Sequence, residues 1–213
     1  MSKLTTFIKN KTKDIFKKKV VLYYFNIVDT SYEDLLAKLD NLTEKDFKML
    51  NEISNEGLRK EKAVSQYFKH RFVGNYKLSK EGKPISNRIS FNISHSHEVV
   101  VIAMCKLADI GVDVEIIRPF KESMRKYISN AKEYEYIKDD ISFLEVWTSK
   151  ESLSKAHGFG ITRDVRTIPA LPVNGQKEYL SNKYTSHTYH IDNTIVSITI
   201  RTRREFETEI HKL

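Results

Sequence analysis

The sequence predicts an α+β fold made of two similarly built halves that meet near residue 108. Of the 213 residues, 40% are hydrophobic, and 11 Phe and 11 Tyr supply the bulk of a globular core. The patterns run in the order strand, helices, two strands, and then strand, helices and strands again. Only seven Gly and four Pro are present, so no flexible linker separates the halves.

The first half is expected to place three helices between its strands. A run of β-branched and aromatic residues predicts the first strand at 20–27. Apolar residues that recur every four positions, Val64, Phe68 and Phe72, predict a long helix over 58–76. The remaining elements of this half are helices that begin at Ser31 and Thr43, a turn over 82–84, and strands near 89–93 and 99–106.

The second half is expected to begin with a strand that has one polar face. Over 110–117, apolar side chains alternate with Gly111, Asp113 and Glu115. A strong helix is expected over 142–157, where two glycines close it. The remaining elements are helices over 121–128 and 131–137, and strands over 184–190 and 194–201 that are joined by a turn at Asp192 and Asn193.

The positive charge is concentrated in the first half. Residues 1–108 carry 20 Lys and Arg against 12 Asp and Glu, whereas residues 109–213 carry 16 of each. Seven of these lysines lie in residues 1–19, against Asp14 alone. We therefore divide the chain into a basic N-terminal extension at 1–19, an N-terminal half at 20–108 and a C-terminal half at 109–213. A basic excess is typical of a polyanionic partner such as nucleic acid or a phosphate-rich cofactor.

The composition also bears on location. A single cysteine, Cys105, makes no internal disulfide, and it lies in an apolar run that predicts burial, as expected in a reducing compartment. No apolar stretch approaches the roughly 18 residues of a membrane span. We expect a cytoplasmic protein without a membrane span.

Four polar residues form the main candidate for a chemical site. Asp113 and Glu115 are two apart on an expected strand and therefore share a face. Glu151 and Lys155 are four apart on an expected helix and also share a face. Three carboxylates of this kind could bind one Mg²⁺, and the lysine could reach a phosphate on that metal.

Three sequence blocks surround these residues and the strand before them. They are FNISHS at 91–96, GVDVE at 111–115 and WTSKESLSKAHG at 147–158. In this order and at these separations, the blocks resemble the signature of the Sfp-type 4′-phosphopantetheinyl transferases. The resemblance covers about residues 89–160.

The resemblance implies a fold in which two α/β halves are related by pseudo-twofold symmetry. It also implies a Mg²⁺-dependent reaction that transfers the phosphopantetheine arm of coenzyme A to a serine of an apo carrier protein and releases adenosine 3′,5′-bisphosphate. By resemblance, Asp113, Glu115 and Glu151 are the metal ligands. Glu151 is also the candidate base, acting directly or through a metal-bound water, and Lys155 neutralises phosphate charge.

Further residues match the family's coenzyme A contacts. By resemblance, Ser94 and His95 contact the 3′-phosphate end, and Lys83 in a Gly-Lys-Pro loop meets the nucleotide. Family members commonly carry two arginines nine apart on the long helix. Lys62 and Arg71 have that spacing here, although a lysine lacks the planar fork of an arginine.

The partner implied by the resemblance is an acidic acyl or peptidyl carrier protein. Four cations and one acid lie in the segment 118–126, which follows the Asp-x-Glu strand, and Phe120 and Met124 are either apolar anchors for a carrier or core residues. The carrier could serve fatty acid, polyketide or nonribosomal peptide biosynthesis. We expect a monomer and no nucleic-acid partner.

Two alternatives and two residue roles stay open at this point. The basic charge and the grouped carboxylates are also compatible with a Mg²⁺-dependent nuclease or a basic nucleic-acid-binding protein. Lys150 is either functional, part of a structural ion pair, or solvated. Asn92 is expected to be structural, bonding backbone in its turn.

Overall fold

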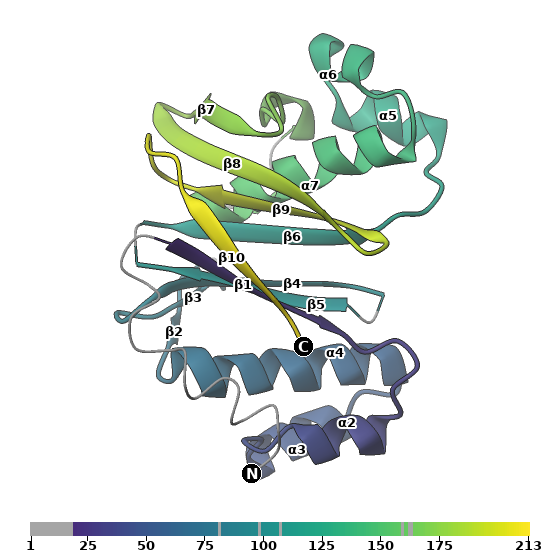
Figure 1. Ribbon diagram of the computed structural model, residues 1–213, viewed down its shortest axis with the longest axis vertical. Helices are drawn as coiled ribbons and strands as arrows, with labels where there is room; N and C mark the ends of the chain where they lie inside the picture. The colour runs from purple at the N-terminus through teal and green to yellow at the C-terminus, as the bar shows by residue number, and fades with distance from the viewer. Residues whose placement is uncertain (1–18, 81, 98, 107, 159, 162–163) are drawn as a thin grey trace.

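The computed structural model describes residues 19–213 except residues 81, 98, 107, 159, 162 and 163. Residues 1–18 of the predicted basic extension lie outside this range. The α+β fold is confirmed: two four-stranded sheets lie against each other, and helices cover their outer faces (Figure 1). Every helix within the described ranges is too short or too polar to cross a membrane.

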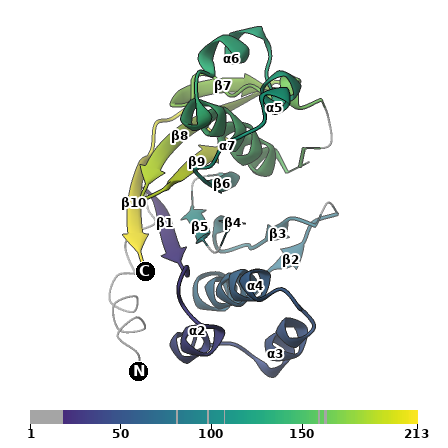
Figure 2. The same ribbon diagram turned by 90° about the vertical axis from the view of Figure 1, so that its right-hand side faces the viewer.

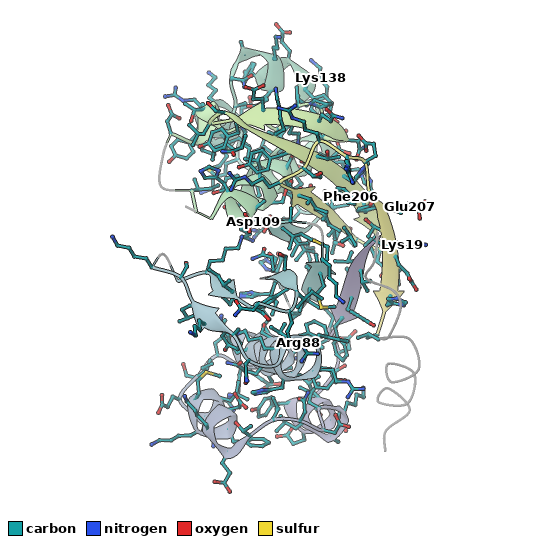
Figure 3. The ribbon with its side chains drawn as sticks, turned by 90° about the vertical axis from the view of Figure 1, so that its left-hand side faces the viewer. Lys19, Arg88, Asp109, Lys138, Phe206 and Glu207 are labelled. Carbon is teal, nitrogen blue, oxygen red and sulfur yellow. The ribbon has the colours of Figure 1, made fainter. Side chains whose placement is uncertain are left out.

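The first sheet has the strand order β10-β1-β5-β4. Its strands are β1 (Lys19–Asn26), β4 (Ser90–Ser96), β5 (Val99–Cys105) and β10 (Glu207–Lys212). The strand β10, at the end of the chain, pairs in parallel with β1. At the start of this pairing, Lys19 Nζ lies 3.3 Å from Glu207 Oε2 (Figure 3). The second predicted half therefore contributes one strand to the sheet of the first.

The second sheet has the strand order β6-β9-β8-β7 and is antiparallel throughout. Its strands are β6 (Ile110–Ile116), β7 (Gly175–Tyr179), β8 (Asn182–Ile191) and β9 (Thr194–Ile200). The chain passes from one sheet to the other between β5 and β6, close to residue 108. Because β4 and β6 are the edge strands of their sheets, each has one backbone edge that no strand of its own sheet pairs with.

Each sheet has a long helix on its outer face (Figure 2). In the first half α4 (Glu56–Phe68) packs on the sheet, beside α2 (Tyr32–Lys38) and α3 (Glu44–Asn51). Ser31 and Thr43 cap α2 and α3, as predicted. The predicted helix over 58–76 is shorter: a π-helical turn, Lys69–Val73, follows α4 and ends at Gly74, whose φ is 71°. Two short strands, β2 (Lys77–Leu78) and β3 (Pro84–Ile85), then form a hairpin.

In the second half, α7 (Asp140–His157) is the long helix. It follows α5 (Glu122–Ile128) and α6 (Ala131–Tyr136), and a short 3₁₀ turn, Val165–Thr167, lies beyond it. Gly158, in the left-handed conformation at φ 103°, ends α7 as the sequence predicts.

Gly111 brings α7 directly against β6. A Cβ at this position would lie 2.0 Å from the carbonyl oxygen of Ser152 and 2.4 Å from the backbone nitrogen of Ala156. Both atoms belong to the backbone of α7, so neither can move out of the way by rotating a side chain. The helix is also tied to β9 by paired hydroxyls: Ser152 Oγ and Thr199 Oγ1 are 2.8 Å apart.

Gly111→Ala is therefore expected to destabilise the protein by about 3 kcal/mol or more, because α7 has to move away from β6. The measurement is the free energy of unfolding from urea titrations. Gly82→Ala is the control, since a Cβ there meets nothing within 4 Å and costs only the left-handed backbone, about 1 kcal/mol. Equal losses for the two variants would contradict this account of Gly111.

Candidate functional site

Two side chains of the edge strand β4 bind the carboxylates of the edge strand β6. Ser94 Oγ donates to Asp113 Oδ1 at 2.9 Å, and Ser96 Oγ donates to Glu115 Oε2 at 2.7 Å. Residues two apart on a strand face the same side, so both hydroxyls reach β6 together. The predicted sharing of a face by Asp113 and Glu115 agrees with these contacts.

Asn92 continues the same row of β4. Its Oδ1 accepts a hydrogen bond from the backbone N–H of Val112 at 3.0 Å, and both groups are buried. The side chain is structural, as predicted, but the expectation that it bonds within its own turn is wrong. Asn92 lies inside a strand, and it joins the two sheets.

Lys155 brings α7 into this junction. Its Nζ lies 2.6 Å from Asp113 Oδ1 and 3.1 Å from Ser94 Oγ. Burial raises the pKa of Asp113, and the charge of Lys155 opposes this shift. The second carboxylate oxygen, Asp113 Oδ2, is buried without a hydrogen-bond partner in the described part of the chain. An oxygen of this kind is available to a cation.

Glu151 lies one helical turn before Lys155. Burial and the negative charges of Asp113 and Glu115 raise the pKa of Glu151 to about 7, and the charge of Lys155 opposes this shift. The charge of Asp113 thus reaches Glu151, and the charge of Glu115 reaches both Asp113 and Glu151. A carboxylate with a pKa near neutrality can accept and release a proton.

The carboxylates are not arranged as a finished metal site. Among the described residues, no three His, Cys, Asp or Glu side chains converge closely enough to hold a metal ion. Asp113 is engaged by Lys155, and Glu115 is engaged by Ser96 and by Arg118, whose guanidinium lies 3.8 Å from it. The donor set and the unpartnered Oδ2 nevertheless fit a hard cation such as Mg²⁺.

Lys83 lies at the same junction, beside the C-terminal end of α7. Its Nζ donates to the carbonyl oxygen of Lys155 at 2.7 Å and to that of Ile110 at 3.4 Å. Burial lowers its pKa, and Asp109 partly offsets this. A cavity of about 210 Å³ adjoins it, lined by Asn92, Lys155 and the glycines that follow α7. The predicted nucleotide residue therefore borders a cavity together with Lys155.

The remaining coenzyme A candidates are more dispersed. His95 follows Ser94 but bonds to Glu61 of α4, with Nδ1 2.7 Å from Glu61 Oε2. Lys62 lies near Lys69. Burial lowers the pKa of Lys69, and the positive charge of Lys62 lowers it further.

Arg71 has different neighbours from Lys62. Burial raises the pKa of both Tyr23 and Tyr67, and the charge of Arg71 opposes each shift. Lys62 lies in α4, whereas Arg71 lies in the π-helical turn that follows it. That Lys62 and Arg71 both contact coenzyme A stays a prediction.

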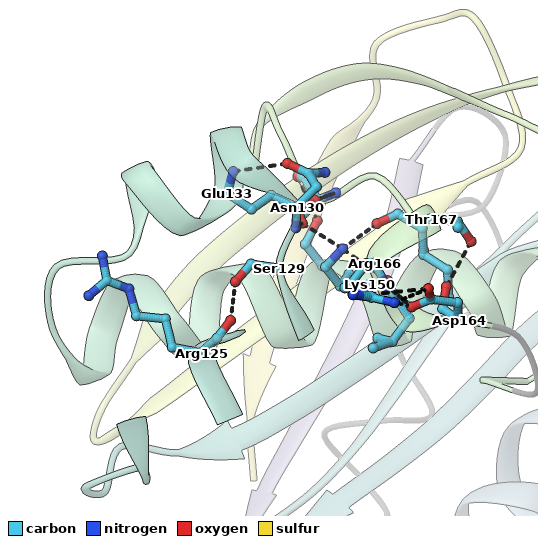
Figure 4. Close-up of polar contacts among 12 residues, drawn as sticks. Arg125, Ser129, Asn130, Glu133, Lys150, Asp164, Arg166 and Thr167 are labelled. Carbon is cyan, nitrogen blue, oxygen red and sulfur yellow. Dashed lines mark hydrogen bonds and ion pairs between the residues drawn. The ribbon is translucent and has the colours of Figure 1, made fainter. Parts of the chain in front are cut away.

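Lys150 has a structural role. Its Nζ lies 2.8 Å from Glu133 Oε2, and both side chains are almost fully buried. The same amine donates to the carbonyl oxygens of Val165 and Ile168, and Glu133 also accepts from the backbone N–H of Ala170 at 2.8 Å (Figure 4). Of the roles left open by the sequence, the structural ion pair is confirmed.

A second buried lysine lies beside this pair and escaped the sequence analysis. Lys177 of β7 donates to Ser149 Oγ of α7. Burial lowers its pKa to about 7, opposed by Glu133 and reinforced by Lys150. A lysine is expected at the surface from sequence alone. In the fold, Lys177 is opposite the buried Tyr184 of β8 and is itself buried.

The segment 118–126 borders a cavity of about 260 Å³ that begins at Glu115. Phe120 stacks on Phe143 with ring centroids 4.0 Å apart, so Phe120 packs inward. The guanidinium of Arg125 lies 3.9 Å from the ring centre of Tyr134. Met124 is 38% exposed and lines the cavity.

Comparisons with known proteins agree with the family resemblance, and the family match includes the second and third sequence blocks. The 4′-phosphopantetheinyl transferase superfamily matches residues 109–204. The chain is similar to the 4′-phosphopantetheinyl transferase gsp of Aneurinibacillus migulanus, with 30% identity over 152 residues, 68% of this chain and 56% of gsp. It is also similar to the 4′-phosphopantetheinyl transferase HetI of Nostoc sp., with 33% identity over 96 residues, 38% of this chain and 40% of HetI.

A third relative is the 4′-phosphopantetheinyl transferase psf-1 of Bacillus pumilus, with 31% identity over 105 residues, 45% of each chain. The chain thus spans about half the length of the curated relatives it matches.

The buried amine of Lys177 predicts a specific dependence of stability on pH. Its pKa is about 7 in the folded protein and near the ordinary 10.5 when unfolded. Between these values the unfolded chain holds one more proton, so the free energy of unfolding rises with pH, by up to about 1.4 kcal/mol per pH unit.

Lys177→Met should remove this contribution, because methionine fills similar space without a charge. Urea titrations at pH 7, 8, 9 and 10 compare the slopes of the variant and the unchanged protein. Lys183→Met, on the more exposed β8 lysine, is the control. The account fails if the slope survives in Lys177→Met or disappears equally in the control.

Proposed function

Because the chain belongs to the 4′-phosphopantetheinyl transferase superfamily, we propose that it transfers the phosphopantetheine arm of coenzyme A to a serine of an apo carrier protein. One observation carries the proposal: the three sequence blocks, far apart along the chain, meet at a single carboxylate. Ser94 of the first block and Lys155 of the third both bond to Asp113 of the second.

The residues around Asp113 suit this reaction. The serine oxygen of the carrier forms a bond to the phosphorus of the arm, and the bond from that phosphorus to the leaving adenosine 3′,5′-bisphosphate breaks. Glu151, whose pKa is about 7, is suited to take the serine proton. Lys155 is suited to bind oxygens of the diphosphate, because its side chain carries a positive charge and lines the cavity.

We propose that Asp113, Glu115 and Glu151 hold Mg²⁺. When bound, this ion supplies positive charge that neutralises the diphosphate of coenzyme A. The unpartnered Oδ2 of Asp113 and the mutual effects of the three carboxylates support the assignment. Lys155 has to release Asp113, which frees its amine for the phosphates.

The setting of the reaction is part of the proposal. The buried thiol of Cys105 supports a reducing, cytoplasmic environment. By the family resemblance we propose a monomer, with its site between the two halves. Neither the matched family nor the three relatives favour a nuclease or a nucleic-acid-binding protein.

Loading of a carrier is expected to require Asp113 and a divalent cation. Asp113→Asn should lower the rate of loading at least about a hundredfold, because it removes the negative charge of β6 to which Ser94 of β4 and Lys155 of α7 bond. The measurement is intact-mass spectrometry of apo carrier proteins incubated with coenzyme A, Mg²⁺ and the protein. Asp192→Asn, an exposed acid paired with Lys212, is the control. Unchanged loading in the presence of EDTA would disprove the metal requirement.

The exposed cations beside the 260 Å³ cavity are proposed to receive an acidic carrier. Arg125 is packed against Tyr134, so the test uses the exposed Lys121 and Lys126 instead. Reversing both to Glu should raise the KM for the carrier, more strongly at low salt where attraction is unscreened, and leave the KM for coenzyme A unchanged.

The matched control reverses Lys132 and Lys138, two exposed cations on and after α6. Carrier kinetics at low salt are measured for both double variants. If both raise the carrier KM equally, general charge rather than this surface is responsible, and the docking assignment is wrong.

A further inference from the structure

His95 and Glu61 form an ion-pair contact that the proposed chemistry has not used. His95 Nδ1 lies 2.7 Å from Glu61 Oε2. The Glu61 side chain is only 10% exposed, whereas a third of the His95 side chain remains open to solvent. Glu61 belongs to α4 and His95 to β4, so the contact joins the helix layer to the edge of the first sheet.

The register of β4 shows which way His95 faces. Residues directly opposite each other on antiparallel strands share a face. Ser94 is opposite Val101, which lies in the core between the two sheets, whereas His95 is opposite Val100, which lies in the core against α4. Ser94 and His95 therefore face opposite sides of an edge strand. A ligand that contacts both has to cross the open edge of β4.

The bond to Glu61 decides which ring nitrogen meets such a ligand. With Nδ1 donating to Glu61, the ring offers Nε2, and no hydrogen bond to Nε2 is found among the described residues. Nε2 donates to a phosphate oxygen only when both nitrogens carry protons. The carboxylate of Glu61 balances the positive charge of that form and fixes the orientation of the ring.

We propose that Glu61 is a positioning residue that holds His95 with Nε2 toward the 3′-phosphate of coenzyme A. The inference rests on the proposed function, together with the family resemblance that assigns His95 to the 3′-phosphate end. It adds that discrimination between coenzyme A and dephospho-coenzyme A, which lacks the 3′-phosphate, depends on a buried acid of α4.

The test compares the two substrates in carrier loading. Glu61→Gln keeps the size of the side chain and an acceptor for Nδ1–H but removes the charge. The KM for coenzyme A is expected to rise about tenfold, the loss of one charged hydrogen bond, with kcat unchanged and the KM for dephospho-coenzyme A within about twofold. Equal rises for both substrates, or a fall in kcat alone, would overturn the inference.

A double variant separates positioning from a merely structural role. If Glu61 acts through His95, then Glu61→Gln adds nothing to the loss already caused by His95→Gln. Additive losses would show that Glu61 acts independently of the histidine and would overturn the inference.

The first half contains a matched control pair. His70 Nε2 lies 2.8 Å from Asp46 Oδ2, and the exposures, 34% and 10%, match those of His95 and Glu61. This pair joins α3 to the π-helical turn and does not involve β4. Asp46→Asn should leave the preference for coenzyme A unchanged. A selective loss as large as that of Glu61→Gln would assign the effect to buried acids in general and overturn the inference.

Calorimetry distinguishes this inference from the proposed function. Adenosine 3′,5′-bisphosphate and adenosine 5′-monophosphate are titrated into the unchanged protein and into Glu61→Gln. If the unchanged protein prefers the bisphosphate and the variant does not, the inference is supported. A preference kept by the variant overturns the inference alone. If the unchanged protein binds neither nucleotide and loads no carrier, the proposed function fails with it.

Discussion

The contact between the backbone of α7 and β6 at Gly111 determines the geometry of the whole site. With a carbonyl oxygen 2.0 Å from where a Cβ would lie, the helix and the strand are as close as two backbones permit. Asp113 lies two residues beyond Gly111 on the same face of β6, and Lys155 is the α7 residue above it. The 2.6 Å bond between Lys155 and Asp113 therefore follows from the fold, not from the reach of a long side chain.

The site also depends on the meeting of two sheet edges. Edge strands expose unpaired backbone groups, and β4 and β6 are joined by hydrogen bonds from the side chains of Asn92, Ser94 and Ser96 beside the apolar core between the two sheets. Burying carboxylates costs free energy unless they are hydrogen-bonded, and Ser94, Ser96 and Lys155 meet most of this requirement. The exception, Asp113 Oδ2, is the atom at which a bound cation would complete the arrangement.

Sequence patterns predicted the helices and strands that have a clear apolar periodicity of their own. They failed to predict structure that depends on contacts with residues distant in the sequence. The strands β1, β5 and β6 and the helix α7 carry their own periodicity, so their positions followed from neighbouring residues. Glu207–Lys212 alternates charged and apolar residues weakly, and it becomes a strand because β1, at the other end of the chain, pairs with it. In the same way, the three blocks predict Asp113, Glu151 and Lys155 as site residues, but only the folded chain reveals that Glu61 reaches His95.

Adjacent residues of α7 have different surroundings, because a helix turns by about 100° per residue. Glu151 faces the carboxylates of β6, whereas Lys150 faces the far side, where it binds Glu133 and the backbone over 165–168. An unpaired charge at this depth is strongly unfavourable, so the two charges require each other, and their hydrogen bonds tie the later part of the chain after α7, at residues 165, 168 and 170, to this pair. That chain begins at the glycines that border the 210 Å³ cavity beside Lys155. One side of α7 thus binds the chain that follows it, and the other side carries Lys155, which lines the cavity.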